Sequence, residues 1–316
     1  MEKRNIRPED AIIIHLISLG IYQVIGFILS SVFKEANNTY IFLAYAIPQV
    51  VYIAVIFAYF ALAKVSFNPL PSKSNIKGMH YPFAIIVALG LFFFAILPVT
   101  GMQKLFALLG KTPSVRVPDL TSPVACVIAA FVMCLLPAIG EELMFRKVVC
   151  DAFLPYGKVA AILISGAIFG FAHLNLAQTV HQIFLGWVLA YIYVKTKNVT
   201  LTSVIHIINN FFALYLTRFT GEEIWNNYTV LGISCVIGAV VLAGGILYFV
   251  FRTPKLLKKA SSVSSDSVIT AVYTEDGKVD LGVESETEPP KQKPSIFVIG
   301  YFAIITVLWI ISAVVS

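Results

Sequence analysis

Two adjacent carboxylates and a guanidinium stand at the end of one of the most apolar runs in the chain, LLPAIGEELMFRKVV (135–149). On a helix, Glu142 and Arg146 are four residues apart, so they share a face and can form an ion pair. Glu141 points about 100° away around the helix, and the residue four positions after it is Phe145. The spacing therefore predicts that Arg146 holds Glu142 ionised as a structural clamp, while Glu141 is left unpaired.

An unpaired carboxylate in an apolar setting holds a proton more tightly than one in water, which suits a general base or acid. Pro137 and Gly140 lie just upstream. A proline bends a helix, and this would open the span around Glu141. The alternative is a charged helix end at the membrane surface.

Two later stretches carry further polar side chains in apolar surroundings. ISGAIFGFAHLN (164–175) places His173 four residues after Phe169, among small residues that permit close helix packing. LTSVIHIINNFF (201–212) places His206 and Asn210 on one helix face, as two hydrogen-bond donors directed at one spot. Such a pair can hold a developing oxyanion, bind an ion, or join two helices.

The remaining polar residues within apolar runs are predicted to have structural roles. We interpret three histidines, His15, His80 and His181, as structural or interfacial, and two glutamines, Gln49 and Gln182, as side chains that join helices. The four cysteines have no CxxC spacing, so neither a zinc ribbon nor a disulfide framework is indicated.

Composition sets the class of protein that must position these residues. The chain is 58% hydrophobic and 13% charged, with a mean hydropathy of +0.85, whereas a soluble domain is about 25% charged. This predicts an all-α integral membrane protein, a polytopic bundle of about 8–9 transmembrane helices. Apolar runs of suitable length lie near 11–33, 41–63, 82–102, 122–145, 159–175, 180–195, 199–217, 228–251 and 296–315.

The runs and the soluble-looking stretch between the last two divide the chain into segments. We predict N-terminal transmembrane helices over 1–121, a four-helix core over 122–220, a transmembrane helix over 221–253 and a C-terminal one over 294–316. Residues 254–293 are rich in Ser, Glu and Pro, which predicts a disordered cytoplasmic loop. Most Lys and Arg residues fall on one side of this topology, which predicts a multi-pass cell-membrane protein with a cytoplasmic N-terminus.

Taken in order, EELMFR (141–146), FGFAH (169–173) and HIINN (206–210) form a pattern that resembles the CPBP family, the intramembrane glutamic endopeptidases of CAAX-processing and bacteriocin-processing type. The resemblance covers roughly 120–220. It implies a peptidase with a cavity open to the cytoplasm. The zincin signature HExxH is absent and an asparagine beside His206 suits a carbonyl oxygen better than zinc, so we expect a metal-free and cofactor-free mechanism. By analogy, Glu141 and His173 activate water and His206 with Asn210 forms the oxyanion hole.

The resemblance also implies supporting roles for Glu142, Arg146 and Phe169, and a peptide or protein substrate, lipidated or membrane-bound. No nucleic acid is expected, and the other partner is the lipid bilayer. Three alternatives stay open. One is a non-catalytic immunity or scaffold protein of the same fold, another is a zinc-dependent membrane protease using Glu and His ligands, and the last is a transporter with Glu141 as its ion site.

Overall fold

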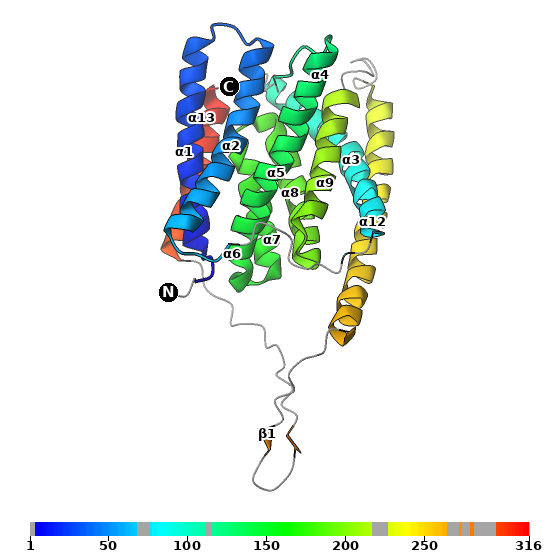
Figure 1. Ribbon diagram of the computed structural model, residues 1–316. Coiled ribbons are helices and arrows are strands. Elements are labelled where there is room, and N and C mark those ends of the chain that lie inside the picture. Colours follow the sequence, from blue (N-terminus) through cyan, green and yellow to red (C-terminus); the bar gives the residue numbers. More distant parts are fainter. Residues whose placement is uncertain are drawn as a thin grey trace.

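The computed structural model describes residues 4–67, 76, 78–111, 116–216, 227–263, 272–273, 279–280 and 295–315. It is a bundle of helices that run roughly side by side (Figure 1), which confirms the predicted all-α class. The helical elements are α1 (Pro8–Val32), α2 (Asn38–Leu62), α3 (His80–Leu108), α4 (Pro123–Ala129), η1 (Ala130–Leu135), α5 (Leu136–Glu142), η2 (Leu143–Cys150), α6 (Asp151–Phe153), η3 (Leu154–Tyr156), α7 (Lys158–Ala172), α8 (Leu176–Thr196), α9 (Val199–Phe211), η4 (Phe212–Leu216), α12 (Tyr228–Val263) and α13 (Ile296–Val315). Within the described ranges the only strands are β1 (Val272–Tyr273) and β2 (Val279–Asp280), which pair antiparallel.

The described helices have the length and composition of membrane spans. Six are long and apolar enough to cross a bilayer: Pro8–Val32, Asn38–Leu62, His80–Leu108, Pro123–Tyr156, Val199–Leu216 and Tyr228–Arg252. The apolar helices Lys158–Ala172 and Ile296–Ser312 are shorter. The chain is therefore a multi-pass membrane protein, as its composition predicts.

Local chemistry fixes where several of these helices begin. Asn37 and Asn198 cap α2 and α9, since each side-chain oxygen accepts a hydrogen bond from a backbone N–H three residues later at 2.9 Å. At the start of α1, Asp10 accepts a hydrogen bond from the backbone N–H of Arg7 at 2.8 Å and forms an ion pair with Arg4. The contacts of Asn37, Asn198 and Asp10 with backbone N–H groups satisfy donors that the first turn of a helix leaves unpaired.

Glycines let α7 and α8 pack closely together. A Cβ atom on Gly166 would lie 2.2 Å from the Trp187 side chain, and one on Gly170 would lie 2.3 Å from that of Ile183. Both distances are far below van der Waals contact, so neither position tolerates a side chain without movement. The close packing predicted for the small residues of α7 is confirmed.

The C-terminal helix α13 packs against α1 and α7. The Tyr301 hydroxyl hydrogen-bonds to Nδ1 of the buried His15 at 2.9 Å, and the Trp309 indole donates to Thr179 at 2.7 Å. The start of α1, the end of α12 and the start of α13 lie at the same end of the bundle (Figure 1). The helix α12 continues to Val263, within the predicted 254–293 loop, and apart from β1 and β2 the rest of that loop lies outside the described residues.

Candidate active site

The two glutamates of the first motif lie at the end of α5, in the middle of a long helical run. Wider π-helical turns flank α5 on both sides, η1 before it and η2 after it. Such turns inside α-helices are rare and occur frequently at functional sites. Pro137 at the start of α5 supplies no backbone N–H, so the backbone bonding is irregular just before Glu141.

Glu142 and Arg146 form a fully buried ion pair. Arg146 Nε lies 3.1 Å from Glu142 Oε2, and both side chains are 0% exposed. Arg146 Nη1 also donates to the Ser165 hydroxyl at 3.3 Å, and its guanidinium carbon lies 5.0 Å from the centre of the Phe169 ring. Buried charges are costly unless paired and hydrogen-bonded: Glu142 pairs with the guanidinium within its own helical run, and the contacts with Ser165 and Phe169 fix η2 against α7.

Glu141 has different surroundings from its neighbour. Its side chain is 11% exposed, and its Oε1 accepts a hydrogen bond from Gln49 Nε2 of α2 at 2.8 Å. Its Oε2 lies 3.7 Å from His206 Nε2. Arg146 pairs with Glu142, as the spacing predicts, whereas Glu141 is bonded to α2 where the sequence predicts no partner.

The imidazole of His206 lies between the two carboxylates. Its Nδ1 is 3.1 Å from Glu142 Oε1, and its Nε2 faces Glu141. Adjacent residues on a helix point in directions that differ by about 100°, and here that angle lets Glu141 and Glu142 approach opposite nitrogens of one ring. When His206 is protonated, both of its nitrogens are donors and each faces a carboxylate.

Asn210 lies one turn after His206 but contacts a different group. Its Nδ2 donates to the backbone carbonyl of Met133 at 3.3 Å. Pro137, four residues after Met133, has no N–H to donate to that carbonyl. The Asn210 amide therefore supplies a donor to the irregular backbone before α5, and one of its two N–H groups remains for another acceptor.

His173 follows the last residue of α7. Its Nδ1 lies 2.8 Å from the carbonyl oxygen of Phe169, and since a carbonyl only accepts, Nδ1 carries the proton and Nε2 has the lone pair in the neutral ring. The next residue, Leu174, has a positive φ of 46°, an uncommon conformation for a residue other than glycine. Within the described part of the chain, no hydrogen bond or ion pair joins His173 to Glu141.

The Phe169 ring links the predicted residues that do not bond to one another. Its centre lies 5.0 Å from that of His173 and 5.8 Å from that of His206, and it also faces the Arg146 guanidinium. The ring is fully buried. It therefore separates Arg146 from His173 and supports both histidine rings.

Two further polar residues lie at this site, although the sequence predicts only structural roles for them. Gln49 bonds to Glu141, and His181 of α8 interacts electrostatically with both His173 and His206. The buried His181 Nδ1 has no hydrogen-bond partner among the described residues. The sequence signal for both was weak: a lone polar side chain within an apolar helix.

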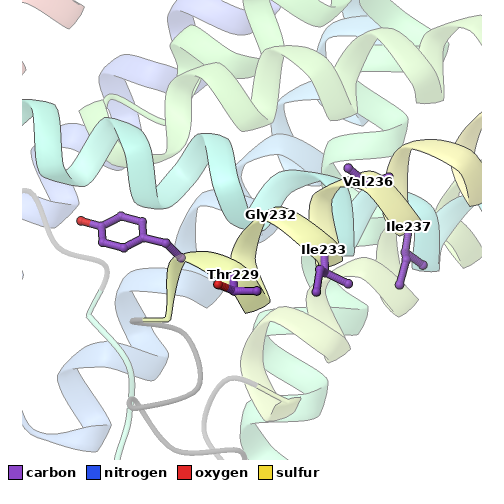
Figure 2. Close-up of a pocket in the computed structure, with 6 residues that line it drawn as sticks. Thr229, Gly232, Ile233, Val236 and Ile237 are labelled. Atoms are coloured by element: carbon purple, nitrogen blue, oxygen red, sulfur yellow. The ribbon is translucent and has the colours of Figure 1, made fainter.

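In the described residues, no group of three or more His, Cys, Asp or Glu side chains is arranged to hold a metal ion. A shallow apolar hollow of about 390 Å³ is lined by the N-terminal part of α12, namely Tyr228, Thr229, Gly232, Ile233, Val236 and Ile237 (Figure 2). None of these residues belongs to the polar cluster around Glu141, and the hollow has the character of a lipid-facing surface.

Comparison with known families places the polar cluster in a defined segment. Residues 123–212 match the family described as Type II CAAX prenyl endopeptidase Rce1-like. This segment is similar to the Rce1-like family. It contains every residue of the three motifs and confirms the resemblance to CAAX-type proteases that they predict. No curated protein and no solved structure matches the chain.

The Rce1-like match supports a peptidase of the CAAX type and, with the apolar helices, a multi-pass membrane protein. The matched segment runs from the start of α4 to the beginning of η4. The helices α1, α2, α3, α12 and α13 lie outside it. Of these, α2 contributes directly to the Rce1-like site through Gln49.

Proposed function

We propose that the chain is an intramembrane endopeptidase that hydrolyses a peptide bond with water activated by Glu141 and His173. The observation that carries this proposal is the difference in burial and in partners between the two adjacent glutamates of the segment that matches the Rce1-like family. Glu142 is fully buried against Arg146, whereas the Glu141 side chain keeps 11% exposure and faces one side of His206. One carboxylate thus has room to meet a water molecule and the other does not.

Glu141 is the base in the first step. Its carboxylate removes a proton from water as the water oxygen bonds to the peptide carbonyl carbon, which forms a tetrahedral intermediate with a negative oxygen. The proton then passes to the leaving nitrogen as the C–N bond breaks. The products are a carboxylic acid and an amine, and Glu141 returns to its ionised state.

His173 assists Glu141 at the same water. Its Nδ1 is held by the Phe169 carbonyl, so Nε2 is the nitrogen that can accept a proton. A water molecule between Nε2 and the Glu141 carboxylate would connect two groups that do not contact each other directly. The strained backbone at Leu174 and the packing on Phe169 hold the ring in this direction.

His206 and Asn210 serve as the oxyanion donors. Glu142 accepts from His206 Nδ1 and stabilises the imidazolium form, in which Nε2–H becomes a donor. The other donor is the second N–H of the Asn210 amide, which does not bond to the Met133 carbonyl. Donors of this kind contribute about 3–4 kcal/mol each when their orientation is fixed in advance.

The substrate class follows from the family and from the membrane setting. We propose a peptide or protein substrate that is membrane-bound or lipidated, and a site that opens to the cytoplasm. The distribution of Lys and Arg supports this orientation, and in it the N-terminus and the ends of α12 and α13 that adjoin the long loop all lie on the cytoplasmic side (Figure 1).

The proposal is tested by cleavage of a quenched peptide library by the purified protein in detergent, with prenylated and unmodified peptides side by side. The variants are Glu141→Gln and Glu35→Gln, the second a matched control at an exposed loop position. A strong metal chelator is included in a parallel series. We expect cleavage that Glu141→Gln abolishes, that Glu35→Gln leaves intact, and that survives the chelator.

The other outcomes select among the alternatives. Cleavage that the chelator abolishes would replace the glutamate mechanism with a metal-dependent one. Failure to cleave any lipidated or unmodified peptide by well-folded protein would favour the scaffold function. Preference for the prenylated series would define the substrate as a CAAX-type peptide.

A further inference from the structure

The hydrogen bond between Gln49 and Glu141 joins the Rce1-like segment to a helix outside it. Gln49 lies on α2, is 5% exposed, and donates from Nε2 to Glu141 Oε1 at 2.8 Å. A side-chain amide in a membrane interior is costly unless it is hydrogen-bonded. Its partner here is the same carboxylate to which we assign the role of base.

Gly140 provides the space for this contact. A Cβ atom at position 140 would lie 2.7 Å from Gln49 Oε1 and 3.2 Å from Gln49 Cα. The amide oxygen thus lies against the glycine, and the amide nitrogen faces the carboxylate beside it. The opposite amide orientation would direct its oxygen at a carboxylate oxygen, so the hydrogen bond to Glu141 Oε1 selects the orientation in which the nitrogen faces Glu141.

The other groups around Glu141 do not replace this donor. From α9, His206 Nε2 is 3.7 Å away, beyond hydrogen-bond distance. From α1 and α2, Tyr22 and Tyr52 interact electrostatically with Glu141, and on its own helix Arg146 is bonded to Glu142. Among the described residues, Gln49 makes the only side-chain hydrogen bond to the Glu141 carboxylate.

Resting on the function proposed above, we propose that Gln49 is a positioning residue that holds Glu141 ionised and directs its second oxygen toward His206. A hydrogen bond donated to the charged form of a carboxyl group favours that form. It also fixes the rotation of the carboxylate, because Oε1 is bonded to α2 and Oε2 is left for the water. The catalytic base is therefore completed by α2, a helix that the family match does not cover.

The pH dependence of cleavage distinguishes positioning from simple packing. Gln49→Met keeps the length of the side chain and removes the donor, and Gln23→Met is the matched control at an exposed position of α1. We expect Gln49→Met to move the acidic limb of kcat/KM upward by about one to two pH units, the equivalent of one hydrogen bond to a charged group. Gln49→Glu, which has the same shape, should move the limb further, since two carboxylates at one site hold a shared proton more tightly.

A limb that stays in place while the maximal rate falls in both variants would overturn the proposal and leave Gln49 a packing residue. Gln23→Met should leave both the limb and the rate unchanged. A shift in the control as large as in Gln49→Met would attribute the effect to general loosening of the bundle and would also overturn the proposal.

Infrared titration separates this proposal from the proposed function. The carboxyl band of Glu141 is identified by its loss in Glu141→Gln, and its midpoint is measured in purified protein with no substrate. We expect the midpoint to rise in Gln49→Met even if no peptide is ever cleaved. An unchanged midpoint in Gln49→Met would refute the role of Gln49, whereas a raised midpoint without cleavage by the wild type would refute only the peptidase function.

Discussion

Arg146→Met tests how much the buried ion pair contributes to the fold. The substitution leaves Glu142, which is 0% exposed, with its charge and without the guanidinium 3.1 Å away. Removing one partner of a buried pair costs about 3–5 kcal/mol when the remaining charge is uncompensated; because Glu142 keeps its contact with His206 Nδ1 at 3.1 Å, we expect a loss near the lower end of this range. The lost hydrogen bond to the neutral Ser165 hydroxyl adds about 1 kcal/mol, which the apolar methionine side chain partly offsets by filling the same space.

Removing both charges should cost less than removing one. In the double variant Glu142→Gln with Arg146→Met, neither charge of the pair remains, and the amide of position 142 can still accept from His206 Nδ1; exchange of a whole buried pair for neutral groups of similar size is often nearly neutral. We therefore expect the double variant to be more stable than Arg146→Met by about 1–3 kcal/mol, the usual coupling energy of residues in one network.

The assay is the free energy of unfolding by denaturant titration in detergent micelles. Lys197→Met is the control, because its ion pair with Asp151 at 2.9 Å is 42% and 25% exposed, and surface pairs contribute about 0–1 kcal/mol. If Arg146→Met costs no more than Lys197→Met, the guanidinium does not stabilise the fold through Glu142. If the double variant is as unstable as Arg146→Met, charge compensation is not the reason for the loss.

Two further substitutions test contacts that hold the site. Gly140→Ala places a methyl group 2.7 Å from Gln49 Oε1, so we expect it to displace α2 and lower kcat at least tenfold in the peptide assay, with a smaller change in thermal stability. Trp309→Phe removes the 2.7 Å hydrogen bond to Thr179 and should cost about 1 kcal/mol of unfolding free energy, measured in the same titration. Thr179→Val removes this bond and also the one that Thr179 donates to the Asn175 carbonyl at 2.7 Å, so it should cost more than Trp309→Phe; an equal or smaller loss would show that the tryptophan contributes mainly by packing.

The part of the site that depends on helix spacing could be predicted from the sequence. Glu142 and Arg146 are four residues apart on one helix, and the ion pair between them follows from that spacing alone. The close approach of α7 and α8 was also predictable, because glycines in an apolar helix indicate tight packing.

The contacts between distant segments could not be predicted in this way. Gln49 and Glu141 are 92 residues apart, and a lone glutamine in an apolar run gives no sign of which helix it will meet. His206 and Asn210 share a helix face as predicted, yet Asn210 donates to Met133. That contact depends on the Met133 carbonyl, to which Pro137 has no N–H to donate. The need for another donor becomes evident only when α9 is seen beside α5.

The arrangement around His206 gives Glu142 a second role beyond its pairing with Arg146. A single imidazole contacts Glu142 through Nδ1 and faces Glu141 through Nε2, so the charge on one carboxylate influences the other through the ring. In the proposed mechanism, a neutral side chain at position 142 would weaken the contact with His206 Nδ1 and, with it, the oxyanion donor on the same ring. We therefore expect Glu142→Gln to lower both the unfolding free energy and kcat. Glu141→Gln should abolish kcat and leave the unfolding free energy within about 1 kcal/mol, since an amide at that position can still meet Gln49. Equal effects of the two substitutions on stability would contradict this division between Glu142, which is 0% exposed, and Glu141, whose side chain is 11% exposed.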